Sequence, residues 1–217
     1  KRVAQAGRLF VHSMRDDWRF WRYAALSLFD SRYEQIVARI MYNVHALEKG
    51  LAQSEGWQPG RSRKALRNLN DALAGYRRQA FDETAYAFMQ GVAIIQRYQE
   101  RHAAAPDSVG FLPAIIDPAF LSPPNAVRFT GAGVKVVTRA SKANNAEKGF
   151  YALCQGRSSV RAFTGRPIRT EQVMNALRNA EKTPSVCNRQ GWRVYWTEDK
   201  DLARNVLRWQ GGFGYPQ

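Results

Sequence analysis

The sequence contains only two cysteines, Cys154 and Cys187, among its 217 residues. Two cysteines make no disulfide framework, and their spacing matches no metal-binding pattern. We therefore expect reduced thiols and no metal site. Cys187 lies inside a polar cluster, but we interpret it as a small packing residue because free cysteine mostly behaves as a small hydrophobe.

Long apolar runs are also missing. The longest candidate, residues 24–29, is far shorter than the roughly 20 apolar residues that span a bilayer. The basic start of the chain does not lead into the apolar core and cleavage site of a signal peptide. These absences predict a cytoplasmic protein with no transmembrane segment.

Acidic residues are scarce. The sequence has 18 Asp and Glu but 33 Lys and Arg, which gives a net charge of +15. The excess is spread over both halves of the chain. A spread positive field attracts anionic ligands, acidic surfaces or nucleic acid without choosing among them. Arg-rich faces such as residues 61–67 leave a basic, helical nucleic-acid-binding protein as an alternative, but no recognised nucleic-acid motif supports it.

The first 104 residues show the three-and-four spacing of apolar residues that is typical of helices with one buried face. We expect helices over residues 31–51, 62–79 and 82–103. The expected core side chains are Tyr33, Ile36, Val37, Ile40, Met41, Val44, Leu47, Leu51, Leu66, Leu69, Leu73, Tyr76, Tyr86 or Met89, Val92 and Ile95. Residues 1–28, rich in arginine and aromatic residues, predict an amphipathic helix that docks on a partner or on the core.

Residues 105–141 form a Pro- and Gly-rich connector whose apolar side chains predict that it wraps over a surface. A helical pattern resumes at residues 142–155. Thr170 is a suitable N-cap for a further helix. Aromatic and β-branched residues at 192–197 predict a strand, and a helix is expected over residues 199–209.

Two polar clusters flank the helix that begins near Thr170. The first, residues 157–161, places two guanidinium groups and two hydroxyls within five residues. Such a group can hold a phosphate, because arginine supplies a planar fork of donors and serine supplies adaptable ones. The second, residues 184–190, is a Pro-Ser turn followed by the amide side chains of Asn188 and Gln190.

Together the clusters resemble the two N-terminal flavin-contacting motifs of the nitroreductase family, the FMN-dependent oxidoreductases. The first motif is matched by Arg157-Ser158-Ser159-Val160-Arg161-Ala162-Phe163 with Pro167-Ile168. The second is matched by Thr183-Pro184-Ser185-Val186-Cys187-Asn188-Arg189-Gln190-Gly191-Trp192, in which Gly191 replaces the usual proline.

The resemblance implies a set of cofactor-binding residues. Those expected to hold the phosphate, ribityl chain and pyrimidine edge of FMN are Arg157, Ser158, Ser159 and Arg161. Those expected at the flavin of the partner subunit are Pro184, Ser185, Val186 and Asn188, with Gln190 in the same motif. Because the two groups of residues serve the flavins of different subunits, the resemblance implies a homodimer with flavin at its interface. No catalytic side chain is expected, because the cofactor carries the hydride.

The fold class implied is α+β, a helical N-terminal region followed by the first part of a nitroreductase-like α/β sandwich. The expected divisions are a helical region over 1–104, the connector over 105–141 and a partial flavin-binding domain over 142–217. The family's later strands, long central helix and C-terminal basic residues have no counterpart in this sequence. We therefore expect a fragment of a longer protein.

The N-terminal helices are similar to the extension of a nitroreductase subgroup often associated with polysaccharide biosynthesis. The similarity is carried by His45-Ala46-Leu47-Glu48-Lys49-Gly50-Leu51. His45 and Glu48 share a helix face. With Lys49 they are candidates for a substrate contact or for a purely structural helix end.

The function implied is an FMN-dependent oxidoreductase that takes electrons from NAD(P)H and reduces a nitro, quinone or other conjugated small-molecule acceptor. An alternative is a binding or assembly partner that keeps the fold without flavin chemistry. The sequence chooses neither the acceptor nor between NADH and NADPH.

Overall fold

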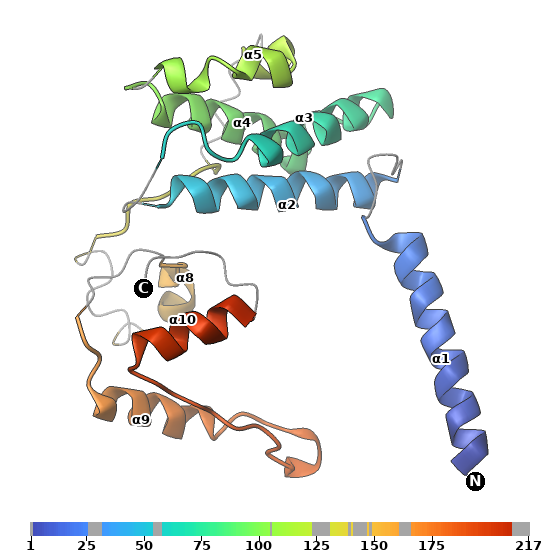
Figure 1. Cartoon of the computed structure of the whole chain (residues 1–217), viewed down its shortest axis with the longest axis vertical. Coiled ribbons are helices and arrows are strands. Elements are labelled where there is room, and N and C mark those ends of the chain that lie inside the picture. The colour runs from blue at the N-terminus through green and yellow to red at the C-terminus, as the bar shows by residue number, and fades with distance from the viewer. Residues whose placement is uncertain are drawn as a thin grey trace. The chain divides into compact units, whose positions relative to one another are not determined.

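The computed structural model of the chain describes residues 2–25, 32–53, 58–104, 106–122, 131–138, 140, 147, 149–160 and 166–209. The chain divides into two compact units, Lys1–Gly156 and Arg157–Gln217 (Figure 1). In the described residues no helix is both long enough and apolar enough to cross a bilayer.

The N-terminal helix α1 spans Arg2–Tyr23, so the helix expected within residues 1–28 forms. Every described side chain from Gln5 to Tyr23 is exposed. The exposed set includes the large side chains of Phe10, Trp18 and Trp21.

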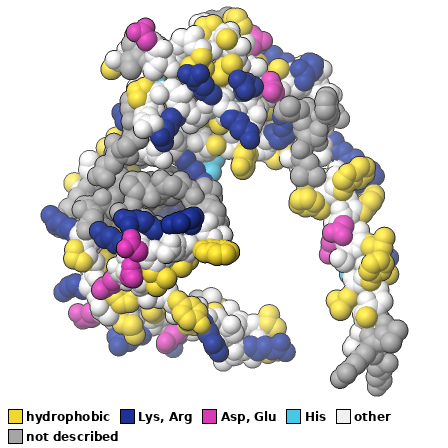
Figure 2. Space-filling model, in the orientation of Figure 1, with side chains coloured by type: hydrophobic (Ala, Val, Ile, Leu, Met, Phe, Trp, Pro, Cys, Tyr) yellow, Lys and Arg dark blue, Asp and Glu magenta, His cyan; other side chains and the backbone are white. Residues whose placement is uncertain are grey.

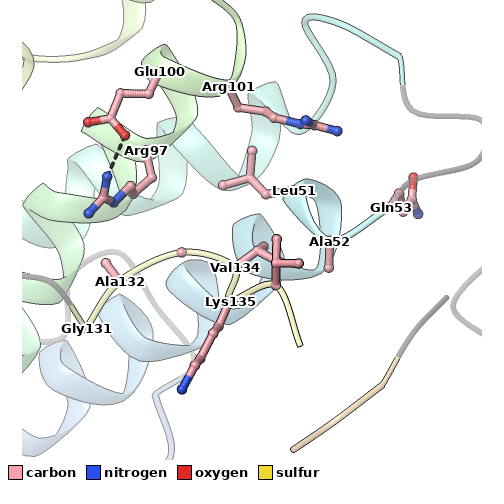
Figure 3. A pocket seen from close by; sticks show the side chains of 12 residues that line it. Leu51, Ala52, Gln53, Arg97, Glu100, Arg101, Gly131, Ala132, Val134 and Lys135 are labelled. Atoms are coloured by element: carbon pink, nitrogen blue, oxygen red, sulfur yellow. Dashed lines mark hydrogen bonds and ion pairs between the residues drawn. The ribbon is translucent and has the colours of Figure 1, made fainter. Parts of the chain in front are cut away.

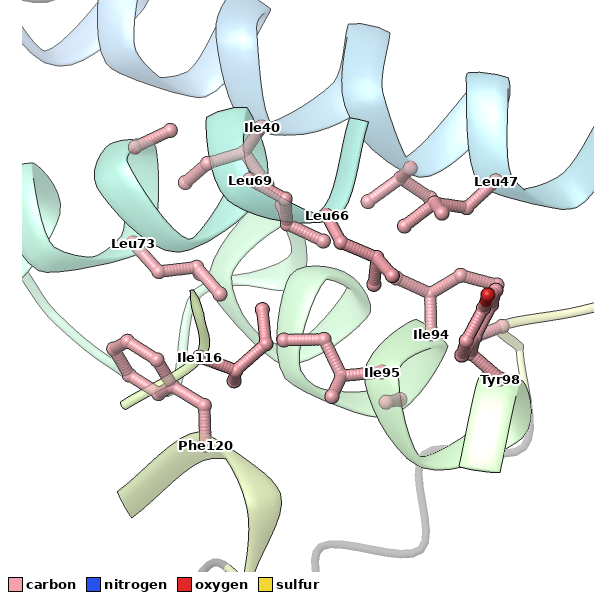
Figure 4. Packing of buried hydrophobic residues seen from close by; sticks show 14 of the residues in the cluster. Ile40, Leu47, Leu66, Leu69, Leu73, Ile94, Ile95, Tyr98, Ile116 and Phe120 are labelled. Atoms are coloured by element: carbon pink, nitrogen blue, oxygen red, sulfur yellow. The ribbon is translucent and has the colours of Figure 1, made fainter. Parts of the chain in front are cut away.

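A three-helix bundle forms the core of the N-terminal unit. It consists of α2 (Tyr33–Leu51), α3 (Arg63–Arg78) and α4 (Tyr86–Arg101), which confirms the three predicted helices with slightly shorter bounds. Figure 4 shows how the bundle side chains interdigitate. The fully buried members include Ile36, Ile40, Val44, Leu47, Leu66, Leu69, Leu73, Tyr76, Ile94 and Ile95.

The predicted faces of α2 and α3 are largely confirmed, but the predicted face of α4 is wrong in part. Ile95 is buried as expected. Of the two alternatives, Tyr86 is 58 % exposed and Met89 is half-buried, as is Val92. The core residues of α4 also include Phe88, Ile94 and Tyr98. The reason is that α4 contacts α2 and α3 and also packs against the connector. The ring centres of Phe88 on α4 and Phe120 in the connector are 6.1 Å apart. A helix covered from two directions buries a broader arc than a single stripe.

The connector packs against the surface of the bundle, as its apolar side chains predicted. It contains the short helices η1 (Pro106–Val109), α5 (Leu112–Ile115) and α6 (Pro118–Leu121). Leu112, Ile116 and Phe120 are buried against the bundle core. Asp117 is the N-cap of α6. Its carboxylate accepts the Ala119 N–H at 2.9 Å, and its own N–H donates to Asn70 Oδ1 at 2.8 Å. This last bond ties the connector to α3.

Four further elements follow the connector within the described residues. They are α8 (Gly149–Gly156), α9 (Thr170–Ala180), η3 (Val186–Asn188) and α10 (Lys200–Trp209). The N-cap of α9 is Arg169 and not Thr170. The Arg169 N–H donates to the side chain of Gln172 at 3.2 Å. A helix near residues 199–209 is confirmed, and Asp199 caps it by accepting the N–H groups of Asp201 and Leu202.

The expected α+β class is wrong for the part of the chain that the structure describes, which contains helices and no strand. The strand predicted at residues 192–197 is irregular. A strand forms only when its N–H and C=O groups pair with a neighbouring strand. Aromatic and β-branched composition shows only that a segment suits such a surface. The prediction of a helical N-terminal region is confirmed.

Candidate functional site

The first polar cluster begins directly after α8, on irregular backbone. Arg157 and Ser159 are exposed, whereas Ser158 is half-buried. The Ser158 Oγ is fully enclosed and has no hydrogen-bond partner in the described part of the chain. A buried hydroxyl without a partner costs about 1–3 kcal/mol, so Ser158 is suited to a polar group that these residues do not supply. Arg161 lies outside the described residues.

The second cluster is a tight turn over residues 185–190. The Asn188 N–H donates to the Ser185 carbonyl oxygen at 2.9 Å. The Gln190 N–H donates to the Ser185 hydroxyl, also at 2.9 Å. Cys187, Asn188 and Gln190 have positive φ angles of 53°, 52° and 45°. Residues other than glycine occupy this region at a cost, and it is tolerated where surrounding bonds hold the backbone in place.

Gln190 organises this turn through its side chain. Its Nε2 donates to the Thr183 carbonyl oxygen at 3.1 Å and to Asn188 Oδ1 at 2.9 Å. Its Oε1 accepts from Trp192 Nε1 at 2.6 Å. The amide of Gln190 is thus used within the turn. Among the side chains predicted to contact the flavin, the donors left for a ligand are the hydroxyl hydrogen of Ser185 and the Nδ2 of Asn188.

The remaining predicted residues of the turn, Pro184 and Val186, are exposed, and Val186 has 80 % of its surface accessible. They offer apolar contact beside the amide donors. Among the described residues, no hydrogen bond or ion pair joins the turn to residues 157–160. Hydrogen bonds organise the turn from within, whereas the first cluster combines the exposed Arg157 and Ser159 with the enclosed hydroxyl of Ser158.

The third predicted group lies on α2. The His45 Nδ1 and the Glu48 Oε2 are 3.8 Å apart, farther than a hydrogen bond. The His45 side chain is about half exposed, and Glu48 and Lys49 are half-buried. The pair is a loose surface contact of little energetic weight. This geometry favours neither a substrate contact nor a purely structural helix end for the group.

A hollow of about 870 Å³ lies where the end of α2 meets α4 and residues 131–136 (Figure 3). Its wall carries Arg97 and Glu100, paired at 2.6 Å, together with Arg101 and Lys135. Sequence reasoning missed this hollow because its walls come from three separate segments. In the described residues no group of three or more His, Cys, Asp or Glu side chains is placed to hold a metal ion.

Residues 154–211 match the sequence model of the Nitroreductase family. This segment is therefore similar to the nitroreductase family. The match contains both polar clusters, and the likeness suggests a flavin-dependent oxidoreductase. Comparisons of the chain with curated proteins and with solved structures gave no match.

The family implies a flavin, and the side chains present fit the polar parts of one. Arg157 offers an exposed guanidinium, and the enclosed hydroxyl of Ser158 lacks a partner within the described residues. Guanidinium and hydroxyl groups are suitable donors for phosphate and ribityl oxygens. The turn at 185–190 adds amide and hydroxyl donors held in a fixed geometry.

Proposed function

We propose that this chain forms part of an FMN-dependent oxidoreductase that takes electrons from NAD(P)H and reduces a nitro, quinone or other conjugated acceptor. The observation that carries the proposal is the nitroreductase match over residues 154–211, which contains both polar clusters. When bound, the flavin supplies the hydride chemistry, and the protein supplies position and electrostatics.

The first cluster binds the cofactor's anionic end in this proposal. Arg157 and Arg161 neutralise the phosphate, and Ser158 and Ser159 donate to phosphate and ribityl oxygens. The Ser158 hydroxyl has no partner within the part of the chain that the structure describes, and this supports the role because a ligand oxygen would satisfy it.

The second cluster serves the flavin of a partner subunit in this proposal. Pro184 and Val186 supply apolar contact, and Ser185 and Asn188 supply donors near the pyrimidine edge, where negative charge gathers on reduction. A homodimer is supported by the exposed apolar surface of residues 157–209, in which Tyr195 is 86 % and Trp209 is 92 % exposed. Apolar surface of this kind favours association.

Two further parts of the proposal rest on the N-terminal unit and on composition. The stretch from His45 to Leu51 supports a place in polysaccharide biosynthesis, with His45, Glu48 and Lys49 as candidate substrate contacts. Two dispersed cysteines, both exposed and free, support a reducing, cytoplasmic setting.

The visible spectrum of the purified protein tests the proposal. We expect flavin absorbance that bleaches when NADH or NADPH is added without oxygen and returns with an acceptor. Colourless protein that takes up no added FMN contradicts it.

A paired substitution tests the phosphate assignment. Arg157→Ala combined with Arg161→Ala should weaken FMN binding by roughly a hundredfold or more, since two charge-assisted contacts are lost. The matched control is Arg178→Ala, because Arg178 is an exposed arginine of the same unit whose guanidinium donates to Asn175 Oδ1 of its own helix at 2.9 Å. Equal FMN affinity in the pair and the control would overturn the assignment of the phosphate to residues 157–161.

A further inference from the structure

Helix α1 carries two parallel stripes along its length. Apolar side chains recur every three or four residues, at Phe10, Val11, Met14, Trp18 and Trp21. Residues with this spacing share one face of a helix. A second stripe beside the first consists of Arg8, Arg15, Arg19 and Arg22.

The apolar stripe is uncovered. Phe10 is 66 %, Met14 is 57 % and Trp21 is 75 % exposed. Figure 2 shows hydrophobic side chains standing out along α1. A contiguous, exposed apolar strip of this kind marks an interaction site.

The basic stripe borders the apolar one closely. The Arg22 guanidinium lies 5.1 Å from the ring centre of Trp18. Arg19 pairs with Asp16 at 3.4 Å, but both side chains are largely exposed, so the pair is weak. Arg8 and Arg15 have no ion-pair partner in the described part of the chain. The helix thus presents positive charge along the edge of an aromatic face.

A bilayer surface with anionic headgroups satisfies both stripes at once. Aromatic side chains, tryptophan above all, favour the boundary between headgroups and acyl chains. Arginines beside them meet lipid phosphates. A second copy of α1 would cover the apolar stripe but bring two rows of arginines together, with Asp16 and Asp17 as the helix's only acids. Nucleic acid would match the arginines but leave the apolar stripe in water.

We propose that α1 binds the surface of an anionic lipid bilayer, lying along it with the apolar stripe in the headgroup region and the arginines on lipid phosphates. This geometry is that of an interfacial amphipathic helix. The inference stands on α1 alone and is independent of flavin binding.

Flotation of the whole chain with lipid vesicles tests the proposal. Vesicles of phosphatidylcholine with one third phosphatidylglycerol should carry the protein, and pure phosphatidylcholine vesicles should carry much less. Phe10→Ser combined with Trp18→Ser should lower partitioning by about a hundredfold, through lost apolar burial. Arg15→Gln combined with Arg19→Gln should lower it roughly fivefold for each charge removed.

Leu9→Ser combined with Phe20→Ser is the matched control. These side chains are also exposed, at 71 % and 65 %, but lie on the opposite side of α1. All the substituted side chains are exposed, so circular dichroism should show an unchanged fold. Partitioning unaffected by the stripe variants would overturn the proposal. The proposal would also be overturned if the protein bound oligonucleotides and not anionic vesicles. A third contradicting result would be stripe variants that change only self-association in light scattering.

Discussion

The imidazole Nε2 of His102 accepts a hydrogen bond from the backbone N–H of Gly60 at 3.1 Å. Because Nε2 is the acceptor, the ring proton is on Nδ1, which donates to the Tyr98 carbonyl oxygen at 2.7 Å. The His102 side chain is 1 % exposed. Gly60 has a φ angle of +74°, and a Cβ there would lie 2.7 Å from the Ser108 carbonyl oxygen. The bond between Gly60 and His102 joins the C-terminal end of α4 to the loop before α3.

Replacement of His102 by alanine should destabilise the N-terminal unit by about 2–4 kcal/mol, because it opens a cavity and leaves the Gly60 N–H unpaired. Chemical denaturation followed by circular dichroism measures the free energy of unfolding. His12→Ala is the control, since His12 is exposed on α1. Equal stability of the two variants would show that the bond from Gly60 contributes little.

Gly91→Ala should destabilise the bundle by about 1–3 kcal/mol, because the core has no room for another methyl group. A Cβ at Gly91 would lie 2.8 Å from Leu73 Cδ2 and 3.1 Å from Ile40 Cγ2. Gly75→Ala is the matched control. It meets only the flexible end of Arg78 at 3.6 Å and should stabilise α3 by about 0.5–1 kcal/mol through helix propensity. Thermal melts that rank the variants in the opposite order would contradict this account of the packing.

The bundle should lose stability between pH 10 and 12. Burial raises the pKa of Tyr76 and of Tyr98 to about 12 each, and both hydroxyls donate to backbone carbonyls, those of Asp82 and Arg61. A tyrosine in the unfolded chain ionises near pH 10. Below that pH both states are neutral and the contribution is complete. Above it the unfolded chain alone releases protons, so the free energy of unfolding falls until the native pKa is passed.

Melting temperatures measured from pH 8 to 12 check this dependence. Tyr98→Phe should be less stable at pH 8, having lost its bond to Arg61, but should lose less stability on going to high pH. Tyr42→Phe changes a tyrosine that is 75 % exposed and should keep the wild-type profile. A Tyr98→Phe profile as steep as that of Tyr42→Phe would show that Tyr98 ionises normally.

Gln190→Ala should weaken FMN binding about tenfold without removing a contact to the flavin. The reason is that the turn at 185–190 loses the three side-chain bonds that join Gln190 to Thr183, Asn188 and Trp192. Gln190→Glu keeps an acceptor for the Trp192 indole but turns a carboxylate oxygen toward the oxygens of Thr183 and Asn188, so its affinity should fall at least as far as that of Gln190→Ala. Asn175→Ala on α9 is the control. FMN titration followed by flavin fluorescence gives the affinities, and an unchanged value for Gln190→Ala would remove the organising role of this residue.

The sequence predicted the bundle well where one face of a helix is buried. Leu66, Leu69, Leu73 and Tyr76 of α3 lie in the core as their spacing indicated. It predicted α4 less well, since Tyr86 points outward and Phe88 inward. Which arc of α4 is buried depends on the connector packing against it, and helical spacing holds no information about that neighbour.

At the flavin clusters, the sequence identified residue types and order, and the family match covers both stretches. The structure adds two facts that the order of residues does not predict. Gln190 bonds within its own turn, and the hydroxyl of Ser158 is enclosed. Both facts depend on backbone angles at residues that tolerate many conformations in isolation.

By itself the sequence determined the helices of the N-terminal region, because three-and-four spacing needs only local geometry to place apolar side chains on one face. It also determined the likeness of residues 154–211 to the nitroreductase family, which rests on residue types in order. Only the tertiary structure decided that residues 192–197 are not a strand, that His102 holds Gly60, and that the stripe of α1 stays uncovered. Each of these depends on which partner is within reach, and local spacing does not encode the partner.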